Sequence, residues 1–107
     1  MTCTKLDSIK VASFNARGLR NSNKRKALLA AILEQNYYIV MLQETYITAD
    51  MVETIEHEWG NEFVCIHSHG TNHSAGVAIL VRKNDNLKIQ SKRNDNEGRM
   101  ALVNIDI

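Results

Sequence analysis

Two apolar stretches in the first half of the chain have the length and composition of β-strands. Ile9 to Phe14 alternates between apolar and polar positions, whereas 38–43 begins as an unbroken apolar run. Alternation predicts a half-buried strand, and a short continuous run predicts a strand that is buried on both faces. Between them, leucine and isoleucine recur every four residues, which predicts a helix with Ser22 as N-cap that ends at Asn36. This order predicts a βαβ unit with parallel strands.

The rest of the pattern predicts one further helix and four further strands. Apolar residues spaced by four predict a helix that starts near Asp50, includes Trp59 in its core stripe and ends at Gly60. Turn-rich segments separate the expected strands, which lie at 63–67, 76–82, 87–92 and 99–107. The expected organisation is a tail over 1–8 and one domain over 9–107.

A polar residue stands where each of the first two strands ends. The first strand runs out at Asn15, and the second is followed directly by Glu44. Since parallel strands end at the same edge of a sheet, and ligands bind beyond the carboxyl ends of such strands, both residues are candidates for a binding site. A carboxylate in this position suits a cation. The alternatives are an ordinary surface role for Glu44 and a turn-forming role for Asn15.

Composition narrows the class of protein. The chain has 107 residues, is 44% hydrophobic, contains no proline and carries a net charge of +1. These values indicate one globular domain. Without an apolar stretch of spanning length or a signal peptide, we expect a soluble intracellular protein with no membrane partner. Cys3 and Cys65 provide neither a disulfide framework nor metal-ligand spacing, and Cys65 is expected to be a small core residue.

The charges are segregated along the sequence. Every charged residue between Ser8 and Leu33 is basic: Lys10, Arg17, Arg20, Lys24, Arg25 and Lys26. A basic segment directly after the first strand suits a polyanionic ligand, and by position Arg17 and Arg20 are candidates for phosphate contact. The charge pattern alone favours the alternative, an ordinary solvated helix start.

Four short sequence motifs follow one another along the chain in an order that indicates a family. They are Ser13-Phe14-Asn15-Ala16-Arg17-Gly18-Leu19, Leu42-Gln43-Glu44-Thr45, Ser74-Ala75-Gly76-Val77-Ala78-Ile79-Leu80 and Gly98-Arg99-Met100. From about Ile9 to Ile107 the chain resembles the N-terminal half of the exonuclease–endonuclease–phosphatase superfamily. It looks closest to the endonuclease domain of LINE-type retrotransposons, a relative of apurinic/apyrimidinic endonucleases. The resemblance implies an α/β (α+β) fold, namely the N-terminal half of a four-layer sandwich with two mixed β-sheets.

The resemblance also implies roles for the two strand-exit residues. Glu44 matches the carboxylate that holds the catalytic divalent ion, Mg2+ or alternatively Mn2+, and Asn15 matches a catalytic residue beside the metal and the scissile phosphate. One carboxylate is enough for such a site, because Mg2+ keeps several waters and binds substrate phosphates. The implied partner is DNA, with a reverse transcriptase as a covalent downstream domain and a nuclear location in the intact relative.

The second half of the family's catalytic apparatus is missing from this sequence. Relatives carry a His paired with an Asp and a further Asp-x-Asn motif, and none of these occurs in a credible position here. We therefore expect an N-terminal piece that is inactive alone and folds poorly, because half of a sandwich exposes an apolar sheet face. A phosphatase of the same superfamily and a catalytically dead DNA-binding or interaction remnant are the alternative functions.

Three histidines form a second possible constellation. His67, His69 and His73 have spacing conceivable for zinc, but the loop before His73 is flexible and no Cys or acid completes a tetrahedron. The pattern therefore favours histidines that lie in loops over a zinc site.

Overall fold

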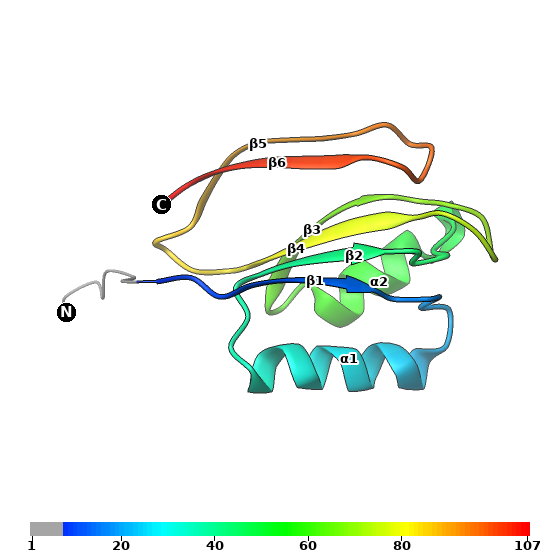
Figure 1. Cartoon of the computed structure of the whole chain (residues 1–107), viewed down its shortest axis with the longest axis horizontal. Helices are drawn as coiled ribbons and strands as arrows, with labels where there is room; N and C mark the ends of the chain where they lie inside the picture. The colour runs from blue at the N-terminus through cyan, green and yellow to red at the C-terminus, as the bar shows by residue number, and fades with distance from the viewer. Residues whose placement is uncertain (1–7) are drawn as a thin grey trace.

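A computed structural model describes residues 8–107, and Figure 1 shows a central sheet with helices on one face and a β-hairpin on the other. The sheet has the strand order β1-β2-β4-β3. Its strands are β1 (Val11–Asn15), β2 (Ile39–Gln43), β3 (Phe63–Ser68) and β4 (Val77–Arg82). β1 and β2 run parallel and the other pairs antiparallel, which confirms the predicted βαβ unit. Most of the predicted tail, together with Cys3, lies outside the described residues.

The remaining elements complete the predicted order. They are α1 (Ser22–Glu34), a 3-10 turn η1 (Ala49–Met51), α2 (Val52–Trp59), β5 (Lys88–Asn94) and β6 (Ala101–Asp106). β5 and β6 form the antiparallel hairpin of Figure 1. The chain is therefore an α+β protein with two sheets, consistent with part of the expected sandwich. None of the helices in residues 8–107 is long and apolar enough to cross a membrane.

Helix α1 begins one residue from the predicted cap. Asn21, rather than Ser22, is the N-cap, because its side-chain oxygen accepts hydrogen bonds from the amides of Asn23 (2.9 Å) and Lys24 (3.1 Å). At the other end Asn36 has φ 58°, so the predicted left-handed termination is confirmed.

The second helical segment starts where predicted, near Asp50, and it has no side-chain cap at either start. Neither Thr48 nor Met51, which precede η1 and α2, makes a side-chain cap hydrogen bond. The Asp50 carboxylate accepts a hydrogen bond from the Thr48 hydroxyl instead, and this bond lowers the pKa of Asp50. The predicted core stripe is present, with Ile55 and Trp59 buried.

The core has two parts, one on each face of the four-stranded sheet. The helices cover a cluster that includes Trp59, Phe63, Leu42 and Leu80, all at most 1% exposed. The hairpin covers a smaller cluster around Val81. Cys65 packs partly buried against the first cluster, as predicted, and burial raises its pKa to about 11.

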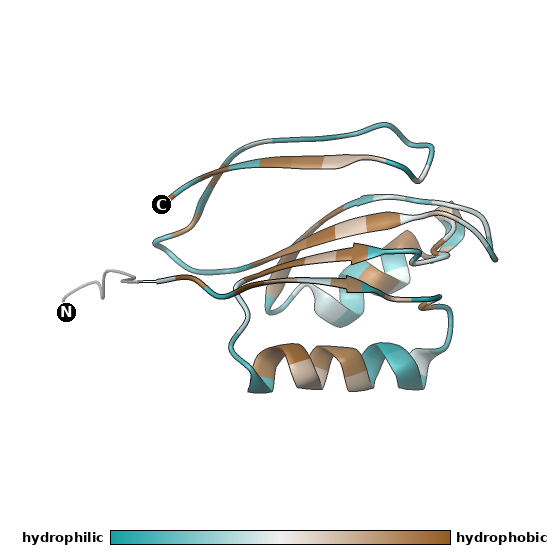
Figure 2. Cartoon of the chain, viewed as in Figure 1, coloured by the Kyte–Doolittle hydropathy of each residue, from teal (hydrophilic) through white to brown (hydrophobic). Residues whose placement is uncertain are grey.

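One face of the parallel strands is left uncovered, which corrects the prediction that the 38–43 strand is buried on both sides. Val40 and Leu42 on the helix side are at most 1% exposed, whereas Met41 is 38% exposed and Val11, on the same face of β1, is 51% exposed. The reason is that the hairpin packs mainly on β3 and β4. Figure 2 shows apolar colouring continuing along the strands below the hairpin. The prediction of an exposed apolar sheet face is therefore confirmed.

Candidate active site

Main-chain hydrogen bonds on both sides hold the segment that carries Glu44. The carbonyl oxygen of Glu44 accepts from the amide of Gly18 (2.7 Å), and that of Thr45 accepts from the amide of Leu19 (2.7 Å). On the other side, the amide of Thr45 donates to the carbonyl of Gly76 (3.0 Å). The exit of β2 is therefore fixed between the loop after β1 and the start of β4.

Unusual backbone conformations are concentrated at this edge of the sheet. Within residues 8–107, six residues other than glycine have positive φ, and four of them lie in these three segments: Arg17, Glu44, Tyr46 and Ala75. Glu44 has φ 52°. A left-handed residue other than glycine costs about 1–3 kcal/mol and persists only where its surroundings enforce it, which is common at functional sites. The main-chain hydrogen bonds on both sides of Glu44, which we call the main-chain clamp, enforce this conformation.

Asn15 and Glu44 lie at neighbouring strand exits on the same edge of the sheet, as predicted. Asn15 is in register with Gln43, and Glu44 is the next residue. Both side chains are exposed, and nothing in the described part of the chain donates a hydrogen bond to the Glu44 carboxylate. The Asn15 side-chain oxygen accepts from the amide of Arg17 at 3.2 Å. Asn15 thus forms a turn, the simpler role considered for it, at the strand exit adjacent to that of Glu44.

Arg17 and Arg20, the two arginines predicted to contact phosphate, differ in whether their side chains already have hydrogen-bond partners. Arg20 donates to the Tyr46 carbonyl (3.3 Å) and the Thr48 hydroxyl (3.0 Å), so its guanidinium fixes the loop after Glu44. Arg17 is exposed, and its side chain has no hydrogen bond or ion pair within residues 8–107. Arg17 is therefore the one of the two that is available to an anion.

Other basic residues of this segment serve the fold. Lys10 donates to the Gln35 carbonyl (2.7 Å), and Lys24 donates to the Ala16 carbonyl (2.7 Å). Arg25 is only 4% exposed and forms a two-point ion pair with Glu58 on α2. The segregated basic residues therefore stabilise the fold at least as much as they indicate ligand binding.

A chain of hydrogen bonds that the sequence did not reveal connects this edge to the hairpin. The Gly76 amide donates to the Gly98 carbonyl (2.8 Å), and the Gly98 amide donates to the hydroxyl of Ser68 (2.7 Å). Ser68, which is fully buried, donates to the Asp95 carboxylate (2.6 Å) and is the main cause that lowers the pKa of Asp95 to about 2. Ser68 lies in a strand with no motif around it, so only its partners show its importance.

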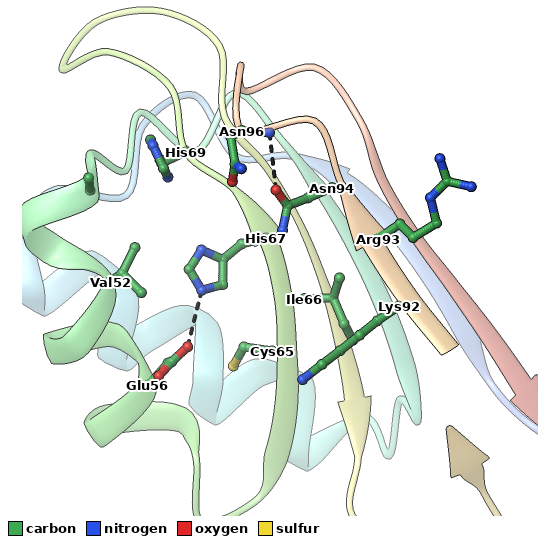
Figure 3. A pocket seen from close by; sticks show the side chains of 11 residues that line it. Val52, Glu56, Cys65, Ile66, His67, His69, Lys92, Arg93, Asn94 and Asn96 are labelled. Atoms are coloured by element: carbon green, nitrogen blue, oxygen red, sulfur yellow. Dashed lines mark hydrogen bonds and ion pairs between the residues drawn. The ribbon is translucent and has the colours of Figure 1, made fainter. Parts of the chain in front are cut away.

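The histidines do not assemble a metal centre. His67 lies in β3, not in a loop, and its ring nitrogen is 3.3 Å from the Glu56 carboxylate. Figure 3 shows His67 pointing toward Glu56, with His69 further along the same cleft. In the described part of the chain, no three His, Cys, Asp or Glu residues are placed to share a metal ion.

The donor groups at the strand exits nevertheless fit a hard divalent ion bound mainly by water and substrate. Mg2+ is often held by one or two carboxylates together with phosphate oxygens, and Glu44 offers an unpaired carboxylate at the strand exit adjacent to that of Asn15. Within residues 8–107, no three such residues are placed to form a site from protein ligands alone, as structural zinc requires.

Comparison with known proteins agrees with this geometry. No curated protein matches the chain. The sequence model of the Endonuclease/Exonuclease/phosphatase family matches residues 12–84, a span that includes both strand exits and the segments that clamp them. Since this match covers more than half of the 107 residues, the chain belongs to the Endonuclease/Exonuclease/phosphatase family, a superfamily of nuclease- and phosphatase-type hydrolases.

Proposed function

We propose that this chain supplies the metal-binding half of a Mg2+-dependent DNA endonuclease of the LINE retrotransposon type. One observation carries the proposal. Glu44 presents a free carboxylate, at the strand exit adjacent to that of Asn15, from a strained backbone segment that main-chain hydrogen bonds hold on both sides. The family generally uses divalent metal ions. The motif order from Asn15 to Gly98 supports the LINE type within that family.

Each residue type has a chemical reason in phosphodiester hydrolysis. Glu44 would hold the ion, which when bound supplies Lewis-acid stabilisation of the phosphoryl oxygens. Asn15 would orient a water or phosphate oxygen through its amide without adding negative charge that repels the substrate. Arg17 offers a free guanidinium to a neighbouring phosphate of the DNA backbone.

The general base is proposed to come from outside these residues. The His67 ring is already paired with Glu56 and lies on β3, which β4 separates from the strand that leads to Glu44. We therefore expect the 107 residues alone to bind a divalent ion and DNA weakly and to show no appreciable cleavage.

Metal binding is tested by titrating Mn2+ into the 15N-labelled chain. We expect paramagnetic broadening centred on the amides of residues 15–18 and 44–46, and its loss in the Glu44→Gln variant. Glu62→Gln is the matched control, because Glu62 is exposed at the opposite end of the sheet, before β3. Broadening that survives Glu44→Gln would reject Glu44 as the metal ligand.

Substrate class is tested separately. A supercoiled-plasmid assay with Mg2+ should show no appreciable nicking by the wild-type chain, and robust nicking that Glu44→Ala abolishes would disprove the expected inactivity. Fluorescence anisotropy should show duplex DNA bound more tightly than an inositol phosphate, with Arg17→Glu weakening the DNA complex. Preference for the inositol phosphate would favour the alternative, a phosphatase of the same superfamily.

A further inference from the structure

The outer edge of β3 forms a groove. Within residues 8–107, β3 is the last strand of its sheet and pairs only with β4. α2 lies along one side of this free edge and β5 along the other. Two cavities occupy the space between them, of about 520 and about 270 Å3, and both are lined by Glu56, Cys65 and Lys92. Their linings together extend along the strand from Phe63 to His69, and we call this stretch the groove.

The groove offers main-chain groups that have no partner. Apart from the ladder with β4, no backbone hydrogen bond in the described residues involves 64–67. About half of the amides and carbonyls of an edge strand point outward, where they can pair with another strand. A strand of six residues rising about 3.3 Å per residue presents about 20 Å of such an edge.

The charge of the groove selects among possible partners. Lys83 and Lys92 lie along it, and both are exposed. The acid that lines the two cavities, Glu56, already faces the ring of His67 at 3.3 Å. Figure 3 shows the Lys92 side chain running from β5 toward Cys65. Lysines on the elements that flank the edge disfavour a basic strand by like-charge repulsion and favour an acidic strand.

We propose that the β3 edge is a docking site for an acidic peptide in extended conformation, which adds as a further strand to the four-stranded sheet. Main-chain hydrogen bonds to β3 supply affinity, and acidic side chains facing Lys83 and Lys92 supply selectivity. The site is separate from the strand exits that carry Asn15 and Glu44, so it stands independently of the proposed nuclease function.

The experiment uses the full 107-residue chain and a fluorescent hexapeptide that alternates Glu and Val. Anisotropy should show saturable binding, at least fivefold weaker for a peptide that alternates Lys and Val. Lys92→Glu should weaken binding of the acidic peptide at least fivefold. Lys88→Glu, on the same strand but lining neither cavity, is the matched control and should leave it unchanged.

Two N-methylated versions of the acidic peptide test strand pairing directly. Methyl groups on one alternate set of amides would face β3 and abolish binding, whereas methyl groups on the other set would face away and preserve it. Equal affinity of both versions, equal loss in both, or no saturable binding of the parent peptide would overturn the proposal. So would displacement of the peptide by a thymidine hexanucleotide at equal concentration, which would indicate a site for polyanions in general.

Discussion

Arg25 on α1 and Glu58 on α2 are joined by two hydrogen bonds, of 2.9 and 2.8 Å. The third guanidinium nitrogen donates to the carbonyls of Leu19 and Arg20, at 3.0 and 2.7 Å. One buried side chain therefore connects both helices to the loop that leads from β1, and that loop in turn holds the backbone of Glu44.

Loss of this ion pair should destabilise the fold. Glu58→Gln removes the charge that balances a guanidinium only 4% exposed, and we expect the free energy of unfolding to fall by about 2 kcal/mol. Urea denaturation measures the change, with Glu62→Gln expected to stay within about 0.5 kcal/mol of wild type. Equal stability of the two variants would show that the pair contributes nothing net.

Acid should weaken the hydrogen-bond chain at Ser68. The Ser68 hydroxyl holds the pKa of Asp95 at about 2, below its ordinary 3.8. A lowered folded-state pKa stabilises the fold above the unfolded value, and this contribution disappears as the pH falls from 3.8 toward about 2. Ser68→Ala should move the Asp95 pKa upward in a carbon-13 NMR titration and flatten the pH dependence of stability in that window. An unchanged titration would assign the shift to the backbone amides instead.

Two glycines with positive φ should respond differently to alanine. At Gly18 (φ 92°) the nearest atoms to an added Cβ belong to the Tyr46 ring, which can rotate aside, so we expect a loss of about 1–2 kcal/mol from backbone strain. At Gly98 (φ 78°) the added Cβ would lie 2.8–2.9 Å from backbone atoms of Gly76, Gly70 and His69. Gly98→Ala should therefore cost more than about 3 kcal/mol when overpacking is added to strain. Thermal and urea unfolding compare the two, and a larger loss at Gly18 would contradict this account.

The uncovered face of the parallel strands should drive self-association. Val11→Thr combined with Met41→Thr removes apolar surface from positions 51% and 38% exposed. We expect sedimentation velocity to show less oligomer at a given concentration, with little change in unfolding free energy. Ser13→Thr, a polar exchange on the same exposed face, should leave the oligomer content unchanged. Unaltered association of the double variant would place the contact elsewhere.

Periodic and local signals in the sequence predicted most of the fold. The parallel pairing of β1 with β2 follows from strand, helix, strand, and the left-handed Asn36 follows from the chemistry of helix ends. The predicted N-cap was wrong by one residue. Asn21 and Ser22 are both good N-cap residues, and only the tertiary path of the loop chooses between them. Burial of Met41 was overestimated because an apolar run does not reveal how far a second sheet extends.

The placement of the two candidate residues was predictable from the sequence, but the contacts that support them were not. Strand-exit position alone placed Asn15 and Glu44 at the same edge of the sheet. The contacts that hold them are mostly main-chain hydrogen bonds between segments distant in sequence, such as Glu44 with Gly18 and Thr45 with Gly76. Such bonds leave no residue-type signature in the sequence. Ser68 and Arg20 act through side chains, but their partners are distant in sequence, so their roles emerged only from the three-dimensional arrangement.

The main-chain character of the clamp around Glu44 has an evolutionary consequence. Substitutions at Arg17, Glu44 and Tyr46 leave the peptide groups that make these hydrogen bonds in place. The shape of the strand exits can therefore be inherited while the side chains displayed there diverge. A scaffold of this kind allows one ancestral framework to give rise to hydrolases with different substrates without being rebuilt at each step.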